Sequence, residues 1–197
     1  AAEEAPARPE PSRKPWRTPQ FLQDRPLTGR EKGSATHLFM QFVRYESCTT
    51  REGIRQELVR MQAEKFLTPR QAEAVDAEKI LALFSSELGN RILHADSLRR
   101  EFKFSILADA AAYDPAAVGE QVMLQGVVDC FWQEPDGIVI LDFKTDYIHG
   151  DLQQKAARYA PQLRAYAQAL SRIYQCPVKK TVLYFFSAGR EVEIDPE

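Results

Sequence analysis

Apolar residues recur at helical spacing along the first half of the chain. Residues 32–45 and 52–66 each repeat them every three or four positions, which predicts two amphipathic helices, the first beginning near Gly33 or Ser34. The run Thr68-Pro69-Arg70-Gln71 combines an N-cap, a proline at the first helical position and a capping-box glutamine. A third helix is therefore expected from there to about Leu88, ending at Gly89-Asn90.

The apolar period then changes from helical to alternating. Residues 98–107 alternate polar and apolar positions, as a half-buried strand does. Residues 122–132 and 137–144 are rich in β-branched and apolar residues, and the turn Glu134-Pro135-Asp136-Gly137 lies between them. The pattern predicts a β-hairpin preceded by another strand.

Helical spacing returns over residues 159–170, with Pro161 either in the first turn or at a kink. Residues 178–186 predict a further strand, with which 191–194 can pair. The order of elements predicts an α/β fold in which a mixed sheet carries helices on its faces, with extra helices at the N-terminal side.

Composition favours one folded domain behind a linker. A chain of 197 residues with 44% hydrophobic content can build one substantial core. Residues 1–26 contain six of the twelve prolines and are expected to form a flexible arm, leaving 27–197 as the domain. Because no apolar run approaches the ~20 residues of a membrane helix and no signal peptide is evident, we expect a soluble, cytoplasmic protein without membrane attachment.

Charge and cysteine content narrow the classes of function. A net charge of −2 disfavours a generally basic nucleic-acid binder, so affinity for phosphates must be local. Basic clusters exist, although each alone is more often solvated surface: Arg13, Lys14 and Arg17; Arg99, Arg100 and Lys103; Lys155, Arg158 and Arg164. Three scattered cysteines, Cys48, Cys130 and Cys176, argue against disulfides and a four-cysteine iron–sulfur cluster. No Gly-x-x-x-x-Gly-Lys-Ser/Thr loop is present, so this chain should not hydrolyse ATP.

The predicted hairpin carries the candidate chemistry. Asp129 ends one apolar run and Asp142 lies in the next, so the hairpin can bring two carboxylates to one edge of a sheet. Carboxylates hold Mg²⁺, which can activate water and clamp the oxygens of a phosphodiester. Asp129 and Asp142 are therefore candidate metal ligands, and the backbone carbonyl of Phe143 is a candidate third.

Lys144 lies two residues after Asp142, so both side chains point to the same face of the strand. An ammonium there can orient a water or balance charge on a phosphate. Taken alone, the pair of Asp142 and Lys144 is as readily explained by an exposed ion pair as by a functional site. The preceding run Ile138-Val139-Ile140-Leu141 is apolar on both faces, and a strand so buried seldom ends in charges that have no use.

These residues resemble the PD-(D/E)XK nucleases, and among them the RecB-like nuclease domains. Four segments carry the resemblance, in the family's order, over about residues 27–186: Leu27 to His37, Gly126-Val127-Val128-Asp129, Asp142-Phe143-Lys144-Thr145-Asp146, and Tyr159 to Tyr166 with its Gln-x-x-x-Tyr pattern. The resemblance implies a restriction-endonuclease-like fold and metal-dependent cutting of DNA.

The resemblance also implies roles for residues that spacing alone does not reveal. His37 becomes a metal ligand, beside the bland alternative of a buried histidine with one hydrogen bond; imidazole suits Mn²⁺, so Mn²⁺ can substitute for Mg²⁺. Glu101 matches an acidic position before the hairpin and is expected to orient a ligand or water. Gln162 and Tyr166 share a helical face. Two roles stay open for them: packing against the sheet, or contact with DNA or support of Lys144 as the resemblance implies.

Other polar and aromatic residues receive plainer interpretations. Thr145 and Asp146 are expected to cap the strand end, and His94 and His149 to be surface residues. Trp16 and Trp132 are more often packed than stacked on bases.

Family resemblance further implies a DNA exonuclease that serves an AddAB-type helicase–nuclease in double-strand-break repair by recombination. The expected partners are DNA, helicase domains of the same polypeptide, which are not in this sequence, and an AddB-type partner protein. One alternative is a catalytically silent DNA- or partner-binding domain with a nuclease fold. A Cas4-like or AddB-like member is disfavoured, because those rely on four cysteines and this chain has three.

Overall fold

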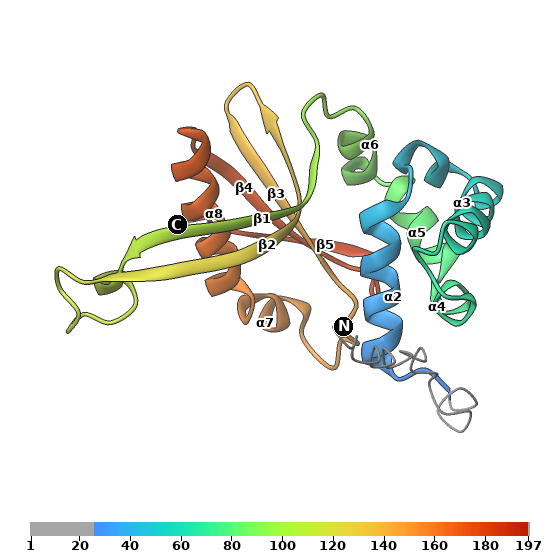
Figure 1. The fold of residues 1–197 in the computed structure, drawn as a ribbon, viewed down its shortest axis with the longest axis horizontal. Coiled ribbons are helices and arrows are strands. Elements are labelled where there is room, and N and C mark those ends of the chain that lie inside the picture. The colour runs from blue at the N-terminus through green and yellow to red at the C-terminus, as the bar shows by residue number, and fades with distance from the viewer. Residues whose placement is uncertain (1–25, 197) are drawn as a thin grey trace, which may run out of the picture.

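The computed structural model describes residues 26–196, and all statements on structure concern this range (Figure 1). The arm predicted for residues 1–26 lies outside it except for the last residue, as do Trp16 and the basic cluster at Arg13. Helices and strands form a mixed α/β architecture, as predicted. Among the described residues, no helix combines the length and apolar character needed to cross a membrane.

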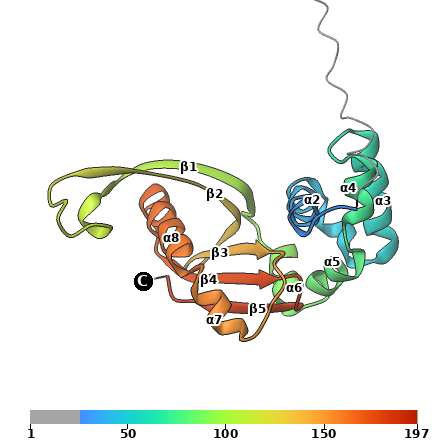
Figure 2. The ribbon, with the colours of Figure 1, turned by 90° about the horizontal axis from the view of Figure 1, so that it is seen from below.

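A five-stranded sheet forms the centre of the molecule (Figures 1 and 2). Its strands follow chain order: β1 (Arg99–Asp109), β2 (Gln121–Glu134), β3 (Gly137–Lys144), β4 (Val178–Phe185) and β5 (Arg190–Ile194). Only the β3–β4 pair is parallel, and the other three pairs are antiparallel. The predicted mixed sheet, the hairpin and the pairing of the last two strands are confirmed.

Helices cover both faces of this sheet and make two apolar cores. One core joins the N-terminal helices to one face through residues such as Phe39, Leu83 and Trp132. The other joins α8 (Ala160–Tyr174) to the opposite face through Leu163 and Leu170. Because both faces are covered, β3 is buried over seven of its eight residues, which explains its continuous apolar run.

The first helices begin and end where polar side chains cap them. Helix α2 (Gly29–Phe42) begins four residues before Gly33, because Thr28 and Glu31 form a capping box. The prediction placed its start too late and its end too far. A short 3₁₀ helix (Tyr45–Thr49) and α3 (Arg51–Ala63) follow.

The prediction of one helix over residues 68–88 was wrong, because the segment forms three short helices: α4 (Pro69–Ala74), α5 (Ala77–Phe84) and α6 (Glu87–Leu93). Its predicted start at Thr68 is confirmed by a complete capping box. Asp76 and Ser86 each accept hydrogen bonds from the backbone of the next helix, so the chain turns twice. Gly89 lies inside α6, where a Cβ would stand 2.2 Å from the carbonyl oxygen of Leu83. It permits close helix packing and does not end a helix.

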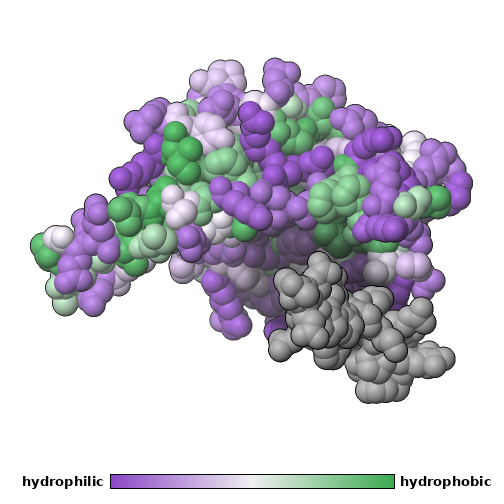
Figure 3. Space-filling view, viewed as in Figure 1, coloured by the Kyte–Doolittle hydropathy of each residue, from purple (hydrophilic) through white to green (hydrophobic). Residues whose placement is uncertain are grey.

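Helix α7 (Leu152–Ala157) and the projection of β1 and β2 from the molecule were not predicted. Helix α7 starts at the N-cap Asp151 and is too short to show a helical period. Pro161 lies in the first turn of α8, which is one of the two places that the sequence left open for it. The outer parts of β1 and β2 project from the molecule as a two-stranded ribbon (Figure 1). This ribbon exposes apolar side chains, including Leu107 and Met123 (Figure 3).

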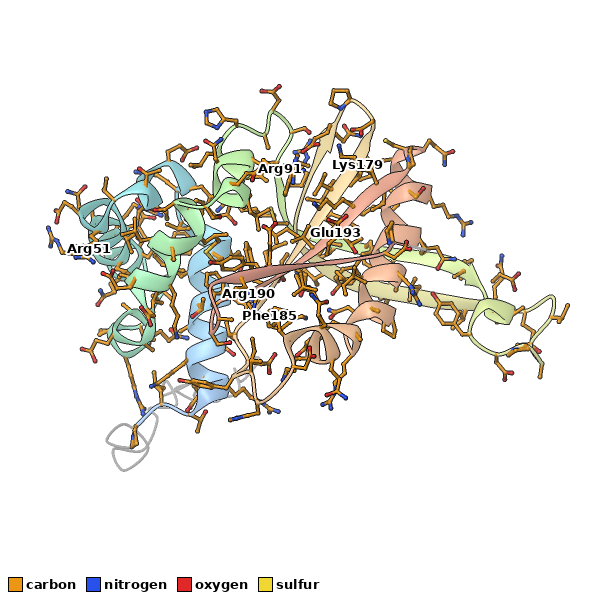
Figure 4. All side chains as sticks on the ribbon, turned by 180° about the vertical axis from the view of Figure 1, so that it is seen from behind. Arg51, Arg91, Lys179, Phe185, Arg190 and Glu193 are labelled. Carbon is orange, nitrogen blue, oxygen red and sulfur yellow. The ribbon has the colours of Figure 1, made fainter. Side chains whose placement is uncertain are left out.

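The turn between β2 and β3 is held by charges from distant elements. Glu134 lies 2.8 Å from Arg91 of α6 and 2.6 Å from Lys179 of β4. It also accepts a hydrogen bond from Trp132 Nε1 at 2.8 Å. Figure 4 shows Arg91 and Lys179 reaching the hairpin end from either side. This cluster fixes the end of the hairpin that lies away from the two aspartates.

Candidate active site

Asp129 and Asp142 lie on neighbouring strands where β2 separates from β3. The last paired residues there are Cys130 and Leu141, each adjacent to one of the aspartates. Asp129 Oδ2 accepts a hydrogen bond of 2.8 Å from the backbone nitrogen of Phe143. Asp142 is almost completely buried. The hairpin therefore brings both carboxylates to one point, as the sequence predicts.

The two carboxyl groups at this point disfavour each other's ionised form. Burial, followed by the charge of Asp142, raises the pKa of Asp129 to about 8. Burial also raises the pKa of Asp142, against the opposing pull of Lys144. Two buried like charges repel, so a cation between them would be favourable.

Lys144 supplies one positive charge beside Asp142. Its Nζ lies 2.7 Å from Asp142 Oδ2 and donates a 3.0 Å hydrogen bond to Gln162 Oε1. Gln162 Nε2 in turn donates to the hydroxyl of Tyr166 at 2.6 Å. Both α8 residues thus face the site, and Gln162 contacts the lysine directly. This geometry favours the interpretation in which they support Lys144.

His37 reaches the carboxylates from α2, more than ninety positions earlier in the chain. Its Nδ1 lies 3.5 Å from Asp129 Oδ2. Burial lowers its pKa, which favours the neutral imidazole that metal coordination requires. Gly33 lets α2 come this close, because a Cβ at that position would stand 2.4 Å from Thr145 Oγ1.

Glu101 approaches from β1 and completes the acidic set. It lines the same cavity as His37 and Asp129, and burial raises its pKa. Its backbone has a φ of 50°, in the left-handed region that residues other than glycine rarely adopt. Such conformations cluster at functional sites, so the strain agrees with the role expected for Glu101.

A cavity of about 710 Å³ opens in front of these residues. It lies between α2, strands β1 and β2 near Glu101 and Asp129, and the loop after β3. Its walls carry polar side chains, including Arg30, Gln41 and Gln71. A second hollow of about 260 Å³ is lined by Lys144 and shares His37, Asp129, Thr145 and Asp146 with the first. The site is therefore reachable from outside through two adjoining hollows.

The donor atoms at this point are of the kinds that a hard divalent cation binds, but the side chains are not arranged around a common centre. Among residues 26–196, no three His, Cys, Asp or Glu side chains are arranged to hold a metal ion as they stand. Asp142 Oδ2 is nevertheless buried, and its close partner is the Lys144 ammonium at 2.7 Å. Carboxylate oxygens with an imidazole suit Mg²⁺ and Mn²⁺.

Several other predicted residues lie apart from this site. Trp132 is buried in the core, as the plainer interpretation expected. His94 and His149 are exposed, also as expected. The side chain of Phe143 is in the core, so only its backbone is available to the site. The thiols of Cys48, Cys130 and Cys176 are free.

Sequence reasoning gave too little weight to Tyr159 and Asp146. Lys144 Nζ lies 4.0 Å from the ring centre of Tyr159, whose hydroxyl donates a 2.6 Å hydrogen bond to Asp146 Oδ2. Asp146 therefore binds a site residue in addition to following the strand end. The available signals were the spacing of Tyr159 one turn before Gln162 and that of Asp146 two residues after Lys144.

Comparison with known proteins places this geometry in a family. The family model described as "PD-(D/E)XK nuclease superfamily" matches residues 13–196. The chain is 41% identical over 195 residues to the A subunit of the ATP-dependent helicase/nuclease of Bacillus cereus (strain Q1), and the match covers 93% of this chain and 16% of that protein. The protein of the same name from Clostridium novyi (strain NT) is 39% identical over 183 residues, covering 89% of this chain and 15% of that protein.

The chain thus spans about one sixth of the length of these relatives. A solved structure, "Crystal structure of SSO0001", overlaps with a TM-score of 0.36 and 18% identity, covering 70% of this chain and 61% of that one, too little to bear on fold or function. The family match covers all of the described residues, including both hairpin aspartates and Lys144. The chain belongs to the PD-(D/E)XK nuclease superfamily.

Proposed function

We propose that this chain is the nuclease part of an AddAB-type helicase–nuclease and hydrolyses DNA phosphodiesters with a bound divalent cation. The single observation that carries the proposal is the meeting of Asp129, Asp142 and Lys144 with His37 at one accessible point. Family membership and the printed names of the relatives support the same conclusion. Mg²⁺ is the proposed ion, and Mn²⁺ is expected to substitute for it.

The carboxylates of Asp129 and Asp142, the imidazole of His37 and the carbonyl of Phe143 would hold the ion. When bound, the ion would supply an activated water and a counter-charge for the phosphate. Lys144 places an ammonium beside the reacting phosphate, where it orients the water and balances negative charge. Gln162 holds that ammonium at 3.0 Å, and Glu101 lies across the cavity as a positioning residue.

The biological setting is also part of the proposal. Relatives that carry helicase and nuclease in their names suggest that DNA is delivered by helicase domains of a longer polypeptide, together with an AddB-type partner protein. The proposed process is exonucleolytic trimming during double-strand-break repair by recombination, in the cytoplasm. ATP hydrolysis would come from those other parts.

The first test substitutes a ligand and measures DNA cleavage. Asp142→Asn should lower the Mg²⁺- or Mn²⁺-dependent rate by about 100-fold or more, because the substitution removes one charge from the metal site. Asp96→Asn, which changes an exposed aspartate before β1, is the matched control and should cut at the parental rate. A parental rate in Asp142→Asn would refute the assignment.

A silent binding domain stays the second candidate, because no three ligands are arranged to hold a metal among the described residues. Calorimetry with Mn²⁺ separates the two. Binding that disappears in Asp129→Asn supports the nuclease, whereas DNA binding without any Asp129-dependent Mn²⁺ binding supports the silent domain.

A further inference from the structure

The ammonium of Lys144 is held on three sides by different elements. Asp142 of the same strand lies on one side and Gln162 of α8 on another. The ring of Tyr159 covers a third side, with its centre 4.0 Å from Nζ. An ammonium has three N–H donors and is attracted to an aromatic face, so these contacts together define one position for Nζ.

These contacts do not serve the same purpose. Asp142 is also a proposed metal ligand, and a bound cation would share its negative charge. The attraction between Asp142 and Lys144 would then be weaker. Tyr159 and Gln162 are then the contacts that keep the lysine in place. Without them a side chain with four rotatable bonds would regain much of its freedom.

The ring of Tyr159 is itself fixed at both ends. Its hydroxyl donates to Asp146 at 2.6 Å, and its ring packs 6.3 Å from the ring of Phe185 in β4. Asp146 is anchored in turn, because the hydroxyl of Ser187 donates to its backbone carbonyl at 2.5 Å. The ring is therefore tied to the loop after β3 and to the strand beside it.

We propose that Tyr159, oriented by Asp146, is the positioning residue that holds the Lys144 ammonium at the reacting phosphate. This inference rests on the proposed function. Tyr159 acts through Lys144 and does not itself touch the reacting atoms. Its contribution should appear in the rate of the bound complex and leave DNA affinity unchanged.

The test combines kinetics with a measurement on the metal-free protein. Tyr159→Leu should lower kcat about tenfold and leave KM within about twofold, as expected for the loss of one partly buried cation–π contact. Tyr159→Phe retains the ring but loses the hydrogen bond to Asp146, so its rate should lie between those of the parent and Tyr159→Leu. Tyr174→Leu is the matched control, because Tyr174 is the last residue of α8, which Tyr159 precedes as N-cap, and packs against Phe102 and Phe131.

The second measurement is the NMR shift of the Lys144 side-chain ε-protons without metal, assigned by its absence in Lys144→Arg. The aromatic ring should shift this signal upfield in the parent protein, and in Tyr159→Leu it should move to the position of exposed lysines. Tyr174→Leu should leave it in place, and Tyr159→Phe, which keeps the ring, should keep it upfield of the position of exposed lysines.

The outcomes are separable. If the parent cleaves DNA but Tyr159→Leu keeps its kcat, or if the lysine signal does not move, the inference fails and the proposed function stands. If Tyr174→Leu lowers kcat as much as Tyr159→Leu, the effect is general packing and the inference also fails. A parent that does not cleave DNA with metal overturns the proposed function, and the positioning role with it.

Discussion

At the scale of single residues, Asp129 and Asp142 show that the candidate active site lowers the stability of the fold. Their carboxylates are buried together, and burial and mutual repulsion raise the pKa of Asp129 to about 8. The nearest compensating charge is the Lys144 ammonium, 2.7 Å from Asp142. An ordinary core would avoid this arrangement, so its presence is best explained by a ligand of positive charge.

Asp129→Asn should therefore stabilise the metal-free protein while abolishing metal-dependent cleavage. The amide keeps an oxygen acceptor for the backbone of Phe143 and removes a carboxyl whose raised pKa makes folding at neutral pH carry the cost of protonating it. The expected gain in the free energy of unfolding is about 1–2 kcal/mol, measured by urea denaturation with a chelator present. Asp96→Asn should change it by less than about 0.5 kcal/mol. An unchanged or lower stability in Asp129→Asn would contradict this explanation.

At the scale of elements, the packing of two short helices depends on a glycine whose role the sequence pattern predicts wrongly. Gly89 has the sequence signature of a helix end, yet it lies inside α6 against α5. A Cβ there would meet the backbone of Leu83 and Phe84 at 2.2 Å and 2.6 Å. Backbone cannot move aside as a flexible side chain can, so the two helices would have to separate.

Gly89→Ala is expected to lower the free energy of unfolding by about 2–3 kcal/mol in spite of the better helix propensity of alanine. The measurement is urea denaturation followed by circular dichroism. Gly29→Ala is the matched control, because a Cβ at this first residue of α2 has no neighbour within 4 Å. Equal stabilities in the two variants would show that α5 and α6 adjust freely.

The charge cluster at the hairpin end predicts a pH dependence. Hydrogen bonds from Lys179, Arg91 and Trp132 lower the pKa of Glu134 from 4.5 to about 2. A lowered carboxyl pKa means that this stabilisation is present above about pH 4.5 and is lost as the pH falls toward about 2.

Glu134→Gln should therefore cost about 2 kcal/mol at pH 7, with the difference from the parent shrinking as the solution is acidified. Thermal unfolding from pH 7 to pH 3 measures it. Glu120→Gln, at an exposed position before β2, provides the control and should match the parent throughout. A difference that stays constant with pH would exclude the ionised carboxylate as its cause.

At the scale of the whole molecule, the sheet joins two cores that come from different parts of the chain. The N-terminal helices supply one core and α8 supplies the other, with the same strands between them (Figure 2). Strands buried on both faces transmit a loss in one core to the other. We therefore predict that residues 27–197 unfold as one cooperative domain.

Leu83→Ala and Leu170→Ala test this prediction from opposite faces of the sheet. Both leucines are fully buried, and each truncation should cost about 2–5 kcal/mol. In a Trp16→Phe background, fluorescence reports Trp132 in the first core alone. For one domain, Leu170→Ala shifts the fluorescence midpoint as far as the circular dichroism midpoint. A shift in dichroism alone would divide the chain into two units.

Much of the fold and the site could be predicted from the sequence, because the signals are local. Residues 138–141 are all apolar and directly follow a turn, so β3 and the hairpin follow from nearest-neighbour geometry. The same geometry places Asp129, Asp142 and Lys144 together, since strand period and pairing leave few alternatives. His37 was predicted only through resemblance to a family, because nothing local links α2 to the hairpin.

Tertiary structure alone decided the remaining features. The division of residues 68–93 into three helices depends on caps that become effective only when the chain turns against a core. The contact of Tyr159 with Lys144 and Asp146 requires α8 to cross the sheet at one place. Sequence patterns determine which face of each element is apolar, whereas the distances among side chains from separate elements depend on how those faces pack. That packing brought an imidazole, two carboxylates and an ammonium to one point.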